Sequence, residues 1–200
     1  MKQAVRQQIV ISGVGGQGVL FVTRLIAESA INNGFRVLTS ETHGMAQRGG
    51  TVVSHLKVGE FESPLIRPLA ADGLLALKAD IPDAHLLFMG PDAWAVVNSR
   101  APVDLDSGKR GQQPAAVYHY DCDGLAADIG NVKSANLVLL GVAIAGMSLG
   151  DKIDTPLFCS IDDIRHVLFE RFSQNKKILD VSVRALEAGY DRFKSMRKRP

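Results

Sequence analysis

A glycine-rich turn, which follows a β-branched run at residues 8–12, is the first segment whose residue types suggest chemistry. Its candidate binding residues are Gly13, Gly15, Gly16, Gln17 and Gly18, which include the spacing Gly-x-Gly-x-x-Gly. Such a turn lets backbone N–H groups approach a phosphate, which the start of the following helix attracts. A P-loop is excluded because Val19 and Leu20 stand where that motif needs Lys and Ser or Thr. The turn therefore predicts a phosphate site, an approach by another chain, or only a tight strand-to-helix connection.

Residues 41–50 form a second candidate segment, directly beyond a predicted strand at residues 36–39. The Arg48 guanidinium offers paired donors for a phosphate or carboxylate, worth about 1.5–3 kcal/mol as a charge-assisted bond, and His43 can titrate near neutral pH as a catalytic acid or base. The alternatives are that Arg48 pairs with Glu41 or Glu62 and that His43 only hydrogen-bonds the loop backbone. Because ligands of open α/β sheets bind beyond the carboxyl ends of strands, we expect both segments at one edge of the sheet. The candidate binding residues here are Glu41, Thr42, His43, Gly44, Gln47, Arg48, Gly49 and Gly50.

The spacing of apolar residues predicts one α/β domain over residues 1–200, with a Rossmann-like, open and mostly parallel sheet flanked by helices and a helical C-terminal part. A strand–helix–strand unit is predicted from the first strand, a helix over 19–33 that ends at Asn33-Gly34, and the strand at 36–39. A right-handed crossover is expected for such a unit. Residues 51–58 alternate like a strand with one exposed face. The other predicted elements are strands at 73–77, 85–89 and 117–120, an exposed loop at 98–114, and helices at 131–148, from Ser160 with a capping box to Asp163, and at 178–196 with an interruption at Gly189.

Composition argues against several classes of protein. The 200 residues are 46% hydrophobic and 22% charged, and Lys+Arg 23 against Asp+Glu 21 gives a net charge of +2, which is unlike a dedicated nucleic-acid binder. The N-terminal residues lack a signal-peptide pattern. The most apolar stretch, residues 135–150, is shorter than the roughly 20 residues that span a bilayer. We therefore expect a cytoplasmic protein that binds neither membrane nor nucleic acid.

Cysteine and histidine usage restricts the metal chemistry of the chain. Cys122 and Cys159 are too few for a disulfide framework or for the four thiolates of a typical iron–sulfur cluster, and Cys159 is expected to be a small buried side chain. His119 and Asp121 would share one face of a strand, but two ligands on one short segment rarely make a site. We predict no metal site in this chain and a strand that ends in a turn at Asp123-Gly124.

The two glycine segments together resemble the gamma-type chain of the 2-oxoacid:ferredoxin oxidoreductases. The similar stretches are residues 13–20 and 40–50, and the further similarities are Ser63-Pro64, Asp72, Asn136 with Leu140-Gly141, and Ala185 with Gly189. The sequence of residues 43–50, His-Gly-Met-Ala-Gln-Arg-Gly-Gly, is most similar to that of the small (beta) subunit of the indolepyruvate branch. Two features depart from the family pattern: Thr42, where an aliphatic residue is expected, and the loop from Asn98 to Gln113, which leaves the substrate branch open.

This resemblance implies an enzyme that is divided between chains, with residues 1–200 as one gamma-type catalytic domain of the pyruvate/ketoisovalerate ferredoxin oxidoreductase kind. The complex would use thiamine diphosphate, Mg²⁺, iron–sulfur clusters and coenzyme A, and would pass electrons to ferredoxin. In the indolepyruvate branch, an aryl pyruvate becomes an aryl-acetyl-CoA and carbon dioxide. The resemblance places the thiamine and cluster sites on a large partner subunit, so this chain would be an accessory subunit, with a homodimer possible when it is isolated.

Two other functions stay open on the residues alone. A free-standing NAD(P)-binding oxidoreductase would use Gly13, Gly15 and Gly18 for the pyrophosphate and Glu41 for a ribose hydroxyl. A nucleotide- or CoA-binding regulatory module without catalysis would use the same turn. Binding of NAD(H) by the isolated chain distinguishes the first of these from an accessory subunit.

Overall fold

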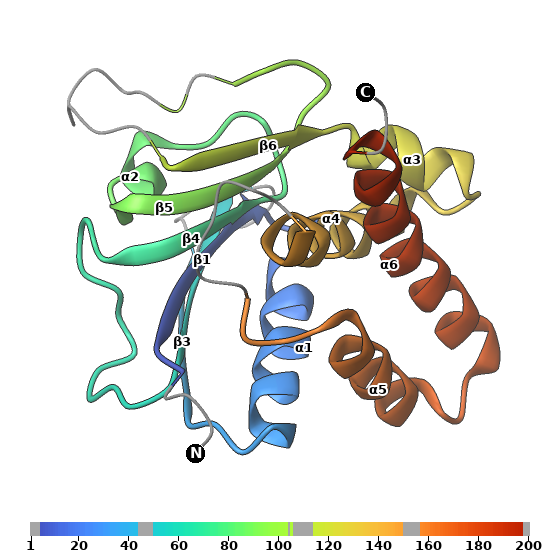
Figure 1. Cartoon of the computed structure of the whole chain (residues 1–200), viewed down its shortest axis with the longest axis horizontal. Helices are drawn as coiled ribbons and strands as arrows, with labels where there is room; N and C mark the ends of the chain where they lie inside the picture. The colour runs from blue at the N-terminus through green and yellow to red at the C-terminus, as the bar shows by residue number, and fades with distance from the viewer. Residues whose placement is uncertain (1–4, 44–49, 104, 106–113, 150–156, 198–200) are drawn as a thin grey trace.

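The computed structural model describes residues 5–43, 50–103, 105, 114–149 and 157–197. Its sheet has six strands in the order β2-β3-β1-β4-β5-β6 (Figure 1). Their bounds are β1 Gln7–Val14, β2 Val37–His43, β3 Thr51–Val58, β4 Ala71–Ala76, β5 Met89–Asn98 and β6 Ala116–Tyr120. Strands β1, β4, β5 and β6 pair in parallel, whereas β3 is antiparallel to both of its neighbours. The predicted open, mostly parallel sheet is confirmed.

Strand β3 separates the two strands of the predicted strand–helix–strand unit. Leu56 of β3 pairs with Ile9 of β1 on one side and with Thr39 of β2 on the other. Strands β1 and β2 therefore point the same way without being neighbours. The expectation of one exposed face on β3 is wrong, because the strand lies inside the sheet and only Thr51 of its eight residues is exposed.

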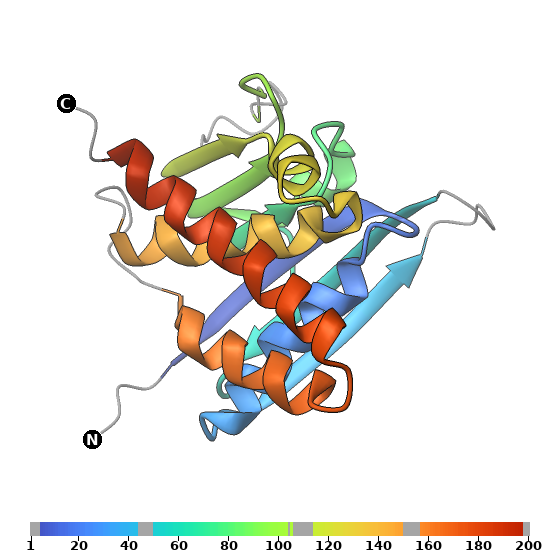
Figure 2. The ribbon, with the colours of Figure 1, turned by 90° about the vertical axis from the view of Figure 1, so that its right-hand side faces the viewer.

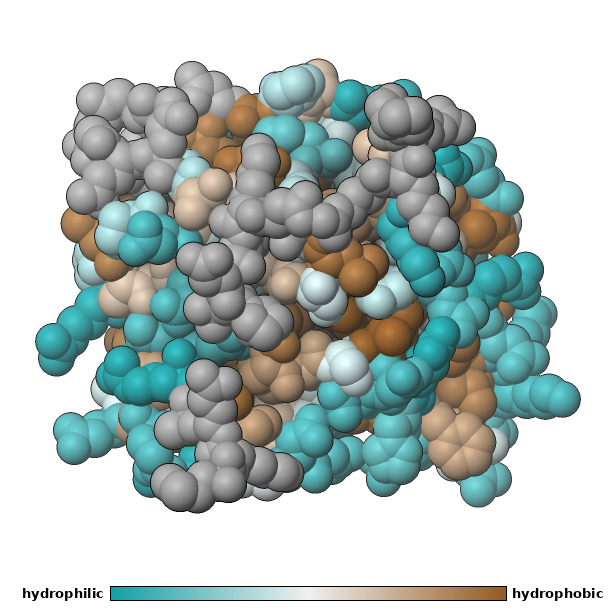
Figure 3. All heavy atoms as spheres, in the orientation of Figure 1, coloured by the Kyte–Doolittle hydropathy of each residue, from teal (hydrophilic) through white to brown (hydrophobic). Residues whose placement is uncertain are grey.

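Most of the helices lie on one side of the sheet, as Figures 1 and 2 show. They are α1 Val19–Asn32, α3 Cys122–Asp128, α4 Ala135–Leu149, α5 Ile161–Phe172 and α6 Lys176–Arg197. Among the residues that the structure describes, the other face carries only the short α2, Asp83–Leu86, together with loop residues such as Ile66 and Leu105. Because side chains alternate along a strand, Ile9 and Ile11 face the long helices while Val10 faces the second core. Helices α5 and α6 turn hydrophilic side chains outward (Figure 3).

Two glycines allow α4 and α6 to cross in direct backbone contact. A β-carbon on Gly141 would overlap the carbonyl oxygen of Leu186, and one on Gly189 would overlap the carbonyl oxygen of Val138. The predicted interruption at Gly189 is wrong, because α6 is continuous there and the glycine marks the crossing. The stretch Val132–Leu149 is long and apolar enough to cross a membrane by length and composition, but 72% of it is buried within the protein, as in a core helix.

The structure also corrects the predicted strand at 85–89. Pro82 and Asp83 begin α2 there, and the strand that follows is β5, Met89–Asn98. A short apolar run without periodicity fits either element, and the preceding proline favours the start of a helix. The predicted capping box is confirmed, since Ser160 and Asp163 exchange both hydrogen bonds at the start of α5.

Two buried histidines lie beneath the thinner face of the sheet. His85 is 7% exposed and shares a 2.6 Å hydrogen bond between its Nδ1 and Ser12 Oγ. His55 is 2% exposed and accepts a bond from the Ile66 N–H at Nδ1 (3.4 Å). Burial lowers the pKa of both histidines, and the neighbouring His85 and Lys57 lower the pKa of His55 further.

We expect these two histidines to make the chain less stable in mild acid. Their folded pKa values lie below the ordinary value of 6.5, so the unfolded chain takes up protons first as the pH falls. Stability is therefore intact above pH 6.5 and decreases below it, by up to about 1.4 kcal/mol at pH 5.5 for each histidine that stays neutral. Chemical denaturation at about pH 6.5 and about pH 5.5 measures this decrease in the free energy of unfolding. The double replacement of His55 and His85 by Phe should flatten the pH profile, because both buried imidazoles are then absent.

Candidate functional site

The glycine turn connects the buried end of β1 to the start of α1. Gly16 and Gly18 have φ values of 93° and 84°, a region that side chains other than glycine rarely adopt. The Gln17 side chain holds the turn: its Oε1 accepts the Val14 N–H (2.9 Å), and its Nε2 donates to the carbonyl of Leu77 after β4 (3.2 Å). The amide of Gln17 is thus engaged inside the protein, while Gly16 lines an open cleft.

The two candidate segments meet at one edge of the sheet. The Gly15 N–H donates to the carbonyl of Gly50 (2.9 Å), immediately before β3. The three residues Glu41, Thr42 and His43 extend β2, whereas a loop was expected from residue 41. The remaining candidates of this segment, Gly44, Gln47, Arg48 and Gly49, lie outside the described residues. The binding roles of both segments stay predictions, but their described ends share an edge as expected.

A cleft of about 380 Å³ opens beside the glycine turn. Its walls are the turn, the ends of β4 and β5, and the segment that leads into α4. The lining residues are Gly16, Gln17, Leu77, Asn98, Asp123, Val132, Lys133, Ala135 and Asn136. A neighbouring hollow of about 280 Å³ continues along the same edge past Lys78 and Arg100. This is the edge where the carboxyl ends of parallel strands place ligand sites in open α/β sheets.

Asn98 joins three walls of the cleft. It is 7% exposed, and its Nδ2 donates to the Leu77 carbonyl (3.2 Å) and to Asp123 Oδ2 (3.1 Å). Its Oδ1 accepts the Cys122 N–H (3.0 Å) at the start of α3. The Leu77 carbonyl thus receives amides from both the glycine turn and β5. Asn98 fixes the ends of β4 and β5 against α3.

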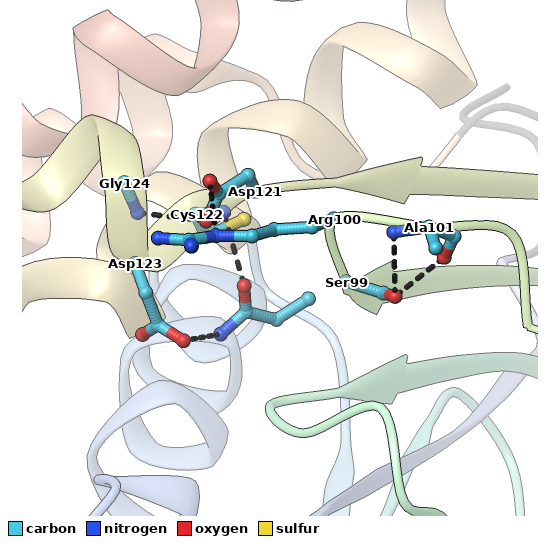
Figure 4. Close-up of polar contacts among 8 residues, drawn as sticks. Ser99, Arg100, Ala101, Asp121, Cys122, Asp123 and Gly124 are labelled. Carbon is cyan, nitrogen blue, oxygen red and sulfur yellow. Dashed lines mark hydrogen bonds and ion pairs between the residues drawn. The ribbon is translucent and has the colours of Figure 1, made fainter.

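An ion pair borders the outer part of the cleft. Figure 4 shows Arg100 reaching across to Asp121, with 2.8 Å between Nε and Oδ2. The same carboxylate caps α3 by accepting the Gly124 N–H (2.8 Å). The predicted turn at Asp123-Gly124 is therefore the first part of a helix instead. Because the Arg100 side chain is 79% exposed, this pair contributes little stability.

The cluster around His119 does not gather into a metal site within the described residues. Asp121 is engaged as a helix cap, and His119 Nδ1 accepts the Val103 N–H (3.4 Å). Both cysteines are buried, and burial is the main cause that raises the pKa of each thiol, to about 12 for Cys159. The expectation that Cys159 is a small buried side chain is confirmed.

Sequence patterns missed most of the cleft. Lys78, Asn98, Arg100 and Lys133 come from three separate segments and carried no signal. Beyond Gly16 and Gln17 of the glycine turn, Asn136 carried one as a family-like position in the long helix. Their common feature is a place just beyond the end of a strand or just before a helix. A sequence reveals this feature only where the strands are correctly predicted. The strand predicted at 85–89 did not match β5.

The position of Glu41 argues against a dinucleotide site. Glu41 pairs with Ser54 of β3, which pairs in turn with Ile11 of β1, so the carboxylate stands two strands from the glycine turn. Neighbouring strands are about 4.8 Å apart, which separates the two by roughly 10 Å across the sheet. A ribose bound at the glycine turn needs its carboxylate partner on the adjacent strand.

Comparisons with known proteins support the family resemblance that the two glycine segments indicated. The family model described as pyruvate ferredoxin/flavodoxin oxidoreductase matches residues 8–192. Indolepyruvate oxidoreductase subunit IorB of Archaeoglobus fulgidus is 30% identical over 200 residues, which cover 93% of this chain and 94% of that protein.

Solved structures show the same fold. Pyruvate oxidoreductase subunit PORC of Thermotoga maritima matches with a TM-score of 0.72 at 19% identity, over 93% of this chain and 96% of that one. The 2-oxoglutarate:ferredoxin oxidoreductase of Magnetococcus marinus, with 2-oxoglutarate, coenzyme A and succinyl-CoA bound, matches with a TM-score of 0.71 at 18% identity. It covers 96% of this chain, which spans about a third of that longer chain (32%). The chain therefore belongs to the pyruvate ferredoxin/flavodoxin oxidoreductase family, as a small subunit of the 2-oxoacid:ferredoxin oxidoreductase type.

Proposed function

We propose that this chain completes an indolepyruvate-type enzyme, which oxidatively decarboxylates an aryl pyruvate to an aryl-acetyl-CoA and reduces ferredoxin. A large partner subunit would carry the thiamine and the clusters. The hydrogen bond from Gly15 to Gly50 is the observation that supports this most directly. It brings both family-like segments to one edge, beside the cleft, where a coenzyme A arm or a partner surface can meet them.

The residues of this chain do not fit the other cofactors of such a complex. Cys122 and Cys159 are buried thiols, and no described group of three metal-binding side chains exists for a cluster or for Mg²⁺. The chain instead offers a polar cleft with Lys133 and Asn136 on one wall and Asp123 on another. We infer that it binds and orients a charged ligand or the partner, and that the bond-breaking step belongs to the partner.

Co-expression with a large thiamine-binding subunit tests this proposal. We expect a stable complex whose viologen reduction requires both an aryl pyruvate and coenzyme A, and a large subunit that is inactive alone. Arg48→Ala should lower the activity or the assembly by about tenfold or more, the value of one charge-assisted bond. Circular dichroism is the control, because a collapsed spectrum would make Arg48 structural. Full activity of the large subunit alone would refute the accessory role.

A free-standing NAD(P)-dependent oxidoreductase is the alternative function, and the register of Glu41 speaks against it. Titration calorimetry of the isolated chain with NADH discriminates the two functions. Micromolar affinity would favour the dinucleotide enzyme, whereas heat indistinguishable from dilution is expected for the accessory subunit.

A further inference from the structure

A leucine adopts a backbone conformation that favours glycine in the loop that joins β3 to β4. The Ala70 N–H donates to the carbonyl of Arg67 (3.2 Å), which closes a turn with Pro68 and Leu69 at its centre. Leu69 has a φ of 60°, as in a type II turn, whose third residue is usually glycine. A left-handed leucine is disfavoured on steric grounds, and such strain is most often found where a protein makes a functional contact.

The strained side chain is exposed, so packing within the protein repays little of its cost. Leu69 is 52% exposed, and its N–H donates to the carbonyl of Leu87 (2.9 Å), a second leucine that is 48% exposed. Leu65, in the same loop, is also 52% exposed. In Figure 1 this loop and α2 lie on the side of the sheet away from α1. Exposed apolar groups of this kind, when polar residues surround them, mark surfaces that bind other proteins.

Three cations lie beside these leucines. The guanidinium carbon of Arg6 is 4.3 Å from the centre of the Phe61 ring, and Lys57 Nζ is 5.0 Å from it. Lys57 is only 6% exposed, yet it forms no hydrogen bond or ion pair within the part of the chain that the structure describes. Burial lowers the pKa of Lys57, and the neighbouring Arg67 and Arg6 lower it further. The positive charges therefore act on one another here.

The flanking carboxylates do not neutralise these cations. Glu60 pairs with Arg36 (2.5 Å), and Asp72 accepts the Gln8 N–H (2.7 Å). Neither forms an ion pair with the three cations among the described residues, and Glu62 is the remaining carboxylate of the loop. Positive charge is thus in excess around Phe61. A second copy of the same surface would bring like charges together, whereas an acidic surface would be attracted.

We propose that this loop and the residue after α2 form a docking surface for an acidic and apolar segment of the large partner subunit. The docking surface consists of Leu65, Arg67, Leu69 and Leu87. Its leucines would pack against apolar side chains of that segment, and Arg67 would bind a carboxylate through two parallel hydrogen bonds. This inference rests on the proposed function, which supplies the partner, and adds the face of the sheet that the partner contacts.

Leu69→Gly separates docking from folding. Glycine adopts the positive φ without strain, so thermal unfolding of the isolated chain should give a melting temperature within about 3 °C of the wild type. Affinity for the separately purified large subunit, measured by biolayer interferometry, should fall by at least about tenfold. Phe169→Ala is the matched control, because Phe169 is 60% exposed on α5 and the variant should leave the affinity unchanged.

Arg67→Glu tests the charge of the partner. The affinity should fall by about tenfold or more at about 0.1 M salt, where charges act over about 10 Å. The loss should be smaller at about 1 M salt, where this distance is about 3 Å. Arg24→Glu, which reverses an exposed arginine on α1, is the matched control and should behave as the wild type at both salt concentrations.

The outcomes distinguish this inference from the proposed function. Weaker binding of both variants with unchanged controls supports the docking surface, whereas a loss for only one of them overturns a partner that is both acidic and apolar. A much lower melting temperature for Leu69→Gly would overturn the docking role of Leu69. An isolated chain whose dimer Leu69→Gly dissociates would replace the large subunit by a second copy. An active complex that neither variant weakens would overturn the docking surface alone, and a large subunit that is fully active without this chain would refute both proposals.

Discussion

Replacing Gly189 by alanine should lower the free energy of unfolding by about 3 kcal/mol, the upper part of the range for overpacked cores. In an ordinary helix interior the same change raises stability by up to about 1 kcal/mol, because glycine costs backbone entropy. Here the added β-carbon would overlap the Val138 carbonyl, so α4 and α6 must move apart. Thermal unfolding should show a melting temperature lower by roughly 6–12 °C for a chain of this size.

Gly146→Ala is the matched control on α4. The three atoms nearest to its β-carbon would be side-chain ring atoms, two of Tyr118 at 3.3 Å and one of Phe193 at 3.6 Å. We expect its free energy of unfolding to change by less than about 1 kcal/mol. A melting temperature that rises on Gly189→Ala would mean that the two helices cross at a greater distance than the structure shows.

Local chemistry explains what the sequence could predict. The glycine turn is visible because positive φ at Gly16 and Gly18 requires glycine, and the start of α5 is visible because Ser160 and Asp163 satisfy each other's backbone donors. Strand β3 has the bounds expected from its β-branched run. These signals depend on neighbours within a few residues, so a single sequence contains them.

The missed features depend on contacts between distant segments. Strand β3 lies between β1 and β2 because it pairs with both of them. A single sequence does not contain this pairing, so the burial of both faces of β3 was not predicted. Gly189 looks like a helix breaker by propensity, and only the approach of Val138, some fifty positions earlier in the chain, explains it. Asn98 is the first residue of the loop predicted at 98–114, yet its side chain links the ends of β4 and β5 to α3.

Asn98→Asp should destabilise the chain at pH 7 by about 2–3 kcal/mol. The introduced carboxylate keeps an oxygen for the Cys122 N–H, but its second oxygen replaces the donor that now serves the Leu77 carbonyl and Asp123 Oδ2. The Leu77 carbonyl would keep the Gln17 amide but lose the second one, and Asp123 Oδ2 would lose the Asn98 donor. Each lost bond costs up to about 1–3 kcal/mol, and the two carboxylates would repel each other.

The pH dependence of Asn98→Asp distinguishes this repulsion from simple loss of packing. The crowded pair raises the folded pKa of one carboxyl above its ordinary unfolded value of about 4. The penalty relative to the wild type is therefore smallest near pH 4 and grows as the pH rises toward 7. Asn32→Asp is the matched control: Asn32 donates to Glu170 Oε2 (3.0 Å) in an exposed pair, so the same replacement should cost less than about 1 kcal/mol. Denaturant titrations of both variants and the wild type between pH 4 and pH 7 make the comparison. A penalty for Asn98→Asp that does not vary with pH would show that residues 98 and 123 are not in direct contact.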